Sequence, residues 1–178
     1  MKTNIGSYRN YNSSENILMT KKNQTLTVGW REWVALPGLD LHAIKAKVDT
    51  GARTSALHAF DIEHYTENGV EMLRFLIHPI QKNRDFYIEC RAPLKDKRQV
   101  TDSGGHREMR YVIETLIVID KYSYPIELTL TDRDTMRFRM LLGREALKER
   151  IIVDPAASFL CGKVNAEQVY GLKTEVNE

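Results

Sequence analysis

The segment of this sequence best suited to chemistry is Asp49-Thr50-Gly51, which can present a carboxylate at the tip of a tight turn. The apolar residue Val48 precedes it, so a buried strand would end at the carboxylate. Gly51 lets backbone approach the carboxylate closely, and the Thr50 hydroxyl can hydrogen-bond across to a second copy of the turn. Two carboxylates in contact share one proton, so that one activates a water molecule while the other polarises a peptide carbonyl. The turn therefore predicts half of a site for peptide hydrolysis.

A second signal, Leu141-Leu142-Gly143, stands far downstream. The apolar pair would lie behind the turn and pin it, while Gly143 would allow the two chain segments to cross closely. The chain supplies one such turn, so two carboxylates require two copies, and we predict a symmetric homodimer. Ala52 lacks the hydroxyl that a Ser would offer the carboxylate, and we therefore expect activity nearer neutral pH.

Two other interpretations of these motifs stay open. Asp, Thr and Gly are common in ordinary turns, so the first segment could simply reverse the chain. Asp102-Ser103-Gly104 is a second string of the same type and could supply the other carboxylate within one chain. The residues before it do not form a convincing buried strand, and no second Leu-Leu-Gly follows it. We therefore interpret it as a polar loop, in which His106 could contact a substrate.

The histidines are the candidate metal ligands: His42, His58, His64, His78 and His106. None belongs to an HExxH pair, the helical arrangement that metallopeptidases use. A catalytic zinc needs three protein ligands and an open position. We predict no metal and no cofactor, but a zinc-dependent hydrolase is kept as an alternative, since distant strands can bring ligands together.

Strand patterns dominate the part of the chain that must position the turn. The expected strands cover residues 26–36, 41–48, 57–65, 70–78, 85–91, 110–120, 124–131 and 151–155, with a hairpin turn at Asn68-Gly69 and a short helix at 144–150. Many short strands with little helix predict a mainly β fold, a closed barrel or sandwich with one short helix near the C-terminus.

Composition indicates one globular domain flanked by polar ends. Residues 1–24 lack an apolar period and are expected to form a flexible arm, residues 25–163 the domain, and residues 164–178 a tail. The formal net charge of +2 argues against a nucleic-acid binder. No apolar run reaches the ~20 residues of a membrane span, and no secretory signal is visible, so the cytoplasm is the expected location. Cys90 and Cys161 are expected to be free thiols.

Three stretches together resemble a bacterial family of retropepsin-like aspartic peptidases, RimK-associated and RimB-like, long called "ATP-dependent zinc protease". They are residues 48–59 (VDTGARTSALHA), residues 103–108 (SGGHRE) and residues 130–147, which begin with LTDR and end with MLLGREAL. The resemblance covers roughly residues 27–163. It implies a retropepsin-like β fold, a catalytic dyad made by two copies of Asp49, and a homodimer acting on a peptide or protein.

The resemblance also implies a partner. Family members often stand beside RimK-type ligases, which add glutamate to a ribosomal protein, so a functional link to such a ligase is expected. No Walker-type GxxxxGK[ST] string occurs, and any nucleotide effect is expected to come through a partner. A non-catalytic peptide-binding or regulatory partner of the ligase is the other alternative, because a fold does not determine a function.

One position departs from the viral retropepsins. They carry an acidic residue two positions beyond the catalytic Gly, where it pairs with the Arg of a later Gly-Arg motif. Here that position is Arg53, which cannot pair with Arg144, so the dimer contacts and the cleft are expected to differ. Arg53, Arg133 and Arg144 could clamp an acidic substrate or form structural ion pairs. The candidate substrate-binding residues are Ala52, Arg53, His106 and Arg144.

Overall fold

The computed structural model describes residues 25–101, 104–132 and 138–172. The predicted arm at 1–24, the Asp102-Ser103 part of the second turn motif, Arg133 and residues 173–178 lie outside this part of the chain. Neither α-helix in the described ranges has the length and apolar character needed to cross a bilayer.

The described chain is mainly β, as predicted. Its strands are β1 (Leu26–Gly29), β2 (Arg31–Leu36), β3 (Leu41–Asp49), β4 (Ser55–His58), β5 (Phe60–Glu67), β6 (Val70–Ile77), β7 (Ile88–Pro93), β8 (Asp96–Thr101), β9 (Arg107–Ile119), β10 (Tyr122–Thr131), β11 (Met140–Gly143) and β12 (Ile151–Asp154). The helical elements are the 3-10 turn η1 (Pro37–Leu39) and the α-helices α1 (Arg144–Leu147) and α2 (Ala166–Val169).

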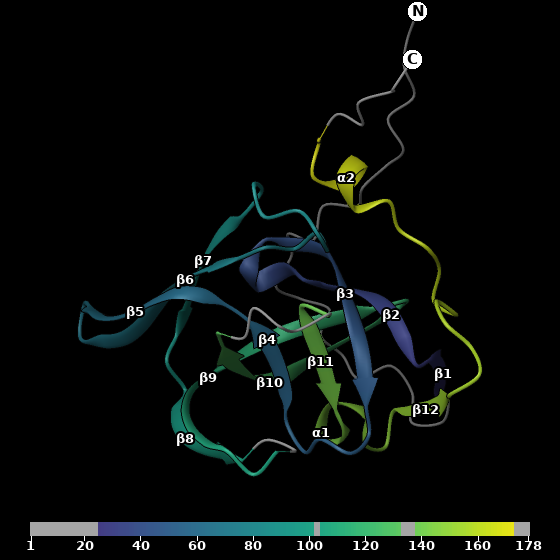
Figure 1. The fold of residues 1–178 in the computed structure, drawn as a ribbon, viewed down its shortest axis with the longest axis horizontal. Helices are drawn as coiled ribbons and strands as arrows, with labels where there is room; N and C mark the ends of the chain where they lie inside the picture. Colours follow the sequence, from purple (N-terminus) through teal and green to yellow (C-terminus); the bar gives the residue numbers. More distant parts are fainter. Residues whose placement is uncertain (1–24, 102–103, 133–137, 173–178) are drawn as a thin grey trace, which may run out of the picture.

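The main sheet has the strand order β10-β4-β11-β3-β2-β9-β8, and β10 pairs additionally with β9 (Figure 1). This extra pairing joins β10, at one end of the order, to β9, which is next to the strand at the other end. Only one residue pair, Ala35 with Val118, joins β2 to β9, so that seam is nearly open. The arrangement is therefore sandwich-like rather than a closed barrel. A separate sheet, β5-β6-β7, carries a hairpin that projects from one side of the molecule (Figure 1).

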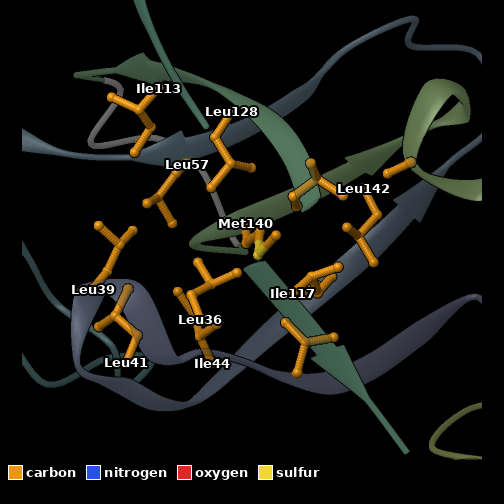
Figure 2. Packing of buried hydrophobic residues seen from close by; sticks show 14 of the residues in the cluster. Leu36, Leu39, Leu41, Ile44, Leu57, Ile113, Ile117, Leu128, Met140 and Leu142 are labelled. Carbon is orange, nitrogen blue, oxygen red and sulfur yellow. The ribbon is translucent and has the colours of Figure 1, made fainter. Parts of the chain in front are cut away.

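The core lies between the layers of the main sheet. Alternating residues of β2 are buried, and β3 and β9 likewise send their apolar side chains inward. Figure 2 shows side chains from different strands packing together there, among them Leu36, Ile44, Leu57, Leu128 and Met140. All five are fully buried. Burial of such side chains supplies the main force that holds the strands in register.

Strand β11 lies between β3 and β4, which follow one another in the sequence. It runs parallel to β3, with Leu142 beside Val48 and Gly143 beside Asp49, and antiparallel to β4. Gly143 passes very close to the chain that connects β3 to β4: a Cβ atom there would lie 2.5 Å from the backbone carbonyl of Thr54. The predicted close crossing of the two segments is confirmed.

Strand boundaries differ from the sequence prediction where the chain changes sheet. The expected strand 26–36 is broken at Trp30, because β1 pairs with β12 whereas β2 pairs with β3. The expected strand 57–65 is broken at Ala59 for the same reason, since β4 belongs to the main sheet and β5 to the smaller one. The hairpin turn at Asn68-Gly69 is confirmed, with φ values of 52° and 79°.

The prediction missed the strands β8 and β11, the 3-10 turn η1 and the helix α2. Strand β8 is a largely exposed edge strand of polar residues, which has no apolar alternation to detect. The predicted single helix at 144–150 ends at Leu147, and a second helix, α2, is present in the segment predicted as a tail. The Tyr170 hydroxyl, just after α2, accepts from the Ala43 N–H at 3.0 Å and donates to the Ala43 carbonyl at 2.8 Å. This docking gives α2 the tertiary support that so short a helix needs.

The cysteines agree with the prediction of free thiols. Burial raises the pKa of Cys90 to about 12 and that of Cys161 to about 11. Such thiols stay protonated at neutral pH and are poor nucleophiles.

The buried carboxylate of Glu32 fastens the C-terminal segment to the sheet. Its side chain is 0% exposed. Oε1 accepts from the N–H groups of Gly29 at 2.7 Å and Leu160 at 2.8 Å, and Oε2 accepts from Cys161 N–H at 3.2 Å. These bonds tie residues 160 and 161 to β1 and β2.

We expect Glu32→Ala to lower the free energy of unfolding by about 3 kcal/mol, because three backbone N–H groups lose their acceptor. Urea unfolding followed by circular dichroism measures this change. The matched control is Glu67→Ala at an exposed carboxylate, which we expect to stay within about 0.5 kcal/mol of wild type. An equal effect of both substitutions would contradict the structural role of Glu32.

We expect Gly143→Ala to destabilise the chain by about 2 kcal/mol or more, because the new methyl group forces the crossing segments apart. Thermal unfolding measures this loss. Gly69→Ala is the comparison, since a Cβ there meets no atom within 4 Å and only the positive φ is unfavourable. A Gly143→Ala protein as stable as wild type would show that the crossing is not tight.

Candidate active site

The predicted catalytic turn lies at the end of a buried strand. Val48 is 7% exposed and anchors the end of β3, while Asp49 is half-buried and Thr50 and Gly51 are exposed. The chain then turns and enters β4 at Ser55. The carboxylate of Asp49 thus stands at the surface on a support that belongs to the core.

Backbone amides hold the Asp49 carboxylate. Its Oδ1 accepts from the Gly51 N–H at 3.1 Å and from the Ala52 N–H at 3.2 Å. A Cβ at Gly51 would lie 3.3 Å from Oδ1, so glycine is the residue that gives this approach most room. Among the described residues no cation pairs with Asp49, and its Oδ2 has no hydrogen-bond partner. That oxygen is therefore available to a water molecule or to a second carboxylate.

The residues after β11 hold the turn from the other side. Arg144 N–H donates to the Ala52 carbonyl at 2.9 Å, and Glu145 N–H donates to the Arg53 carbonyl at 3.1 Å. The Arg144 guanidinium donates to the Gly51 carbonyl at 3.1 Å. The start of α1 is thereby joined to the whole turn, and the two distant motifs of the sequence form one site.

The two arginines of the site have the positions expected from the viral comparison. Arg53 does not pair with Arg144; it lies 3.7 Å from Glu145 in an exposed ion pair. Arg53 thus forms one of the structural ion pairs considered for it, and its contact with a substrate stays a prediction. An exposed pair of this kind contributes little to stability.

An open hollow of about 640 Å³ lies beside the turn. It is lined by Thr50, Arg144, Glu145, Leu147, Lys148, Ile151 and Val153. Thr50 belongs to this lining, so the surface next to the Asp49 turn is concave and partly apolar.

The other predicted site residues occupy different positions. Leu142 is fully buried behind the turn, as expected, whereas Leu141 is only half-buried. His106 is exposed between β8 and β9, and its contact with a substrate stays a prediction.

Sequence reasoning missed Ser55. The buried Ser55 hydroxyl accepts from the Gly143 N–H at 3.1 Å, and the Ser55 carbonyl accepts from the Thr129 hydroxyl at 3.1 Å. The signal in the sequence was a Ser at the start of an apolar strand. Where such a strand is buried, the Ser hydroxyl needs a hydrogen-bond partner.

The histidines do not assemble into a metal centre. Within the described residues no three His, Cys, Asp or Glu side chains come together in a group that could hold an ion. His58 is buried in β4, whereas His64 lies on β5, where its Nε2 is 2.6 Å from a Glu71 carboxylate oxygen.

Proteins of known sequence match most of the chain. A "Probable alpha-L-glutamate ligase" from Shewanella pealeana is 44% identical over 150 residues, which is 83% of this chain and 33% of the ligase. A protein of the same name from Parasynechococcus marenigrum is 45% identical over 163 residues, covering 89% of this chain and 34% of the ligase. The chain therefore spans about a third of the length of these relatives.

A solved structure supports the fold. A protein of unknown function from Legionella pneumophila superposes with a TM-score of 0.66 at 26% identity, covering 78% of this chain and 99% of that one. The family model described as "Retropepsin-like aspartic endopeptidase RimB" matches residues 27–163, which include both the Asp49 turn and β11. The chain therefore belongs to the RimB-like family of retropepsin-like aspartic endopeptidases.

Proposed function

We propose that this chain is an aspartic endopeptidase that works as a homodimer, with Asp49 of each copy supplying one carboxylate. The observation that carries the proposal is the Asp49 turn itself. Its Oδ1 is held by two backbone amides, its Oδ2 is open, and β11 fixes the turn from behind. Preorganised carboxylates of this kind are suited to general acid–base catalysis.

The proposed mechanism requires a second carboxylate close to the first. Two Asp49 side chains at a two-fold axis cannot both be charged, so one carries the shared proton. The charged Asp49 takes a proton from a water molecule, which attacks the peptide carbonyl. The partner's Asp49 donates its proton to the carbonyl oxygen and stabilises the tetrahedral intermediate. Thr50 and the adjacent hollow are the surfaces proposed to meet the second copy.

The names of the relatives favour a role near glutamate ligation. The match lies within proteins named probable alpha-L-glutamate ligases, so we propose that the substrate is a peptide or protein modified by a RimK-type ligase. Arg144 at the edge of the turn would place a positive charge next to an acidic substrate. The proposed setting is the cytoplasm, which suits two free thiols.

A non-catalytic regulatory partner of such a ligase is the second candidate, and the same relatives favour it. The two candidates differ in one property, because only a peptidase cleaves the peptide that it binds. A zinc-dependent hydrolase is the remaining alternative, and stoichiometric zinc in protein purified without chelator would support it.

We expect Asp49→Asn to reduce peptide cleavage by at least about 1,000-fold, because the amide cannot take a proton from water. Cleavage of a glutamate-rich peptide library, followed by mass spectrometry, measures this loss. Asp85→Asn, at an exposed carboxylate of a loop, is the matched control and should cleave like wild type. Retained cleavage by a folded Asp49→Asn protein would rule out the proposed mechanism, and binding without cleavage by wild type would favour the regulatory role.

A dyad made by two chains predicts that the inactive variant suppresses the active one. After exchange with a threefold excess of Asp49→Asn chains, we expect activity per wild-type chain to fall to about a quarter, because most wild-type chains then sit in mixed dimers. Sedimentation confirms that dimers form, and the same excess of an unrelated protein is the control. Undiminished activity in proven mixed dimers would show that each chain has a complete site.

A further inference from the structure

The outer face of the β2–β3 ladder carries positive charge. Arg31 lies across from Lys47, and Trp33 lies across from Lys45. The alternate residues of the same strands, such as Glu32, are buried, so these four side chains point to the opposite face. The face therefore combines three cations with an aromatic ring.

These cations are not neutralised within the described part of the chain. Neither Arg31 nor Lys45 has a carboxylate within ion-pair distance there, whereas Arg74 on β6 and Lys95 between β7 and β8 each contact carboxylates. The Nε atom of Arg31 is buried and has no hydrogen-bond partner. Burial and, secondly, the charge of Arg31 lower the pKa of Lys45. The two positive groups thus repel each other without a compensating anion.

Aromatic rings hold both cations in place. The Arg31 guanidinium lies 4.5 Å from the centroid of the Trp30 ring and 4.8 Å from that of Phe159. The Lys45 ammonium lies 4.9 Å from the Trp33 centroid and 5.6 Å from that of Phe159. Cation–π contacts stabilise this arrangement and reduce the entropy that the side chains lose on binding a ligand.

A hollow of about 540 Å³ opens beside Lys45. It is lined by Trp33, Lys45, Ile80, Gln81, Lys163, Val164, Asn165, Ala166 and Glu167. The lining contains two lysines and one carboxylate, that of Glu167. Arg31 is not in the lining, but it lies over the same Phe159 ring as Lys45. The volume is in the range of small-molecule sites.

We propose that this hollow binds a small polyanion, such as a diphosphate or a tricarboxylate, through Lys45 and Lys163. Several negative charges on one small molecule would compensate the repulsion between Lys45 and Arg31, which a single charge does less well. The site is separate from the Asp49 turn, so it goes beyond the proposed peptidase and does not depend on it.

The test is isothermal titration calorimetry of the full chain with inorganic pyrophosphate and with citrate, each in low-salt buffer. We expect one-to-one binding that Lys45→Gln weakens by at least about tenfold, since a charged hydrogen bond is lost. Lys45→Arg keeps the positive charge and should therefore retain clearly more binding than Lys45→Gln. Lys121→Gln is the matched control, because Lys121 also lies over a ring, that of Tyr122, but does not line the hollow.

Each outcome decides the proposal. Binding of either anion that is lost in Lys45→Gln and kept in Lys45→Arg supports it, and the preferred anion identifies the ligand as phosphate or carboxylate. If neither anion shows saturable binding, the proposal is overturned. This holds even if a long acidic peptide binds to the protein. Equal loss in Lys45→Gln and Lys121→Gln overturns it as well. Asp49→Asn should bind like wild type, so a failed peptidase mechanism leaves this result unaffected.

Discussion

Gly143 crosses the backbone of Arg53 and Thr54 so closely that no side chain fits between the segments, and this crossing determines where Asp49 points. The strand that carries Gly143 is paired on both edges, with β3 on one side and β4 on the other. A turn between two strands would ordinarily be a mobile surface feature. Here the inserted strand converts it into a rigid support, because any movement of the turn must break backbone hydrogen bonds of the core sheet.

The geometry of the Asp49 turn could be predicted from sequence because it depends on residue types with narrow physical roles. These residues are a carboxylate after an apolar strand, a glycine that permits close approach and an apolar pair behind the turn. The support of the turn was harder to foresee. Ser55 and the backbone of Arg144 act through hydrogen bonds between residues far apart in sequence, and such bonds leave no periodic pattern.

The fold class could be predicted because many short segments show alternating apolar residues. The boundaries of the strands could not be predicted in this way. Alternation of apolar residues continues through Trp30 and Ala59, although the chain leaves one sheet and joins another at each of them. The exposed strand β8 is held in its conformation by pairing with β9, so the residue types of β8 alone do not predict a strand. Helix α2 likewise depends on the contact between Tyr170 and Ala43. Tertiary contacts therefore decided what local patterns left undetermined.

The order of these elements along the chain has a consequence for synthesis on the ribosome. Asp49 emerges early, but the strand that supports it begins only at Met140, and β1 waits for a partner that begins at Ile151. Pairings between such distant residues form slowly and late. A growing or truncated polypeptide that ends before β11 thus carries the Asp49 carboxylate without the strand that supports it.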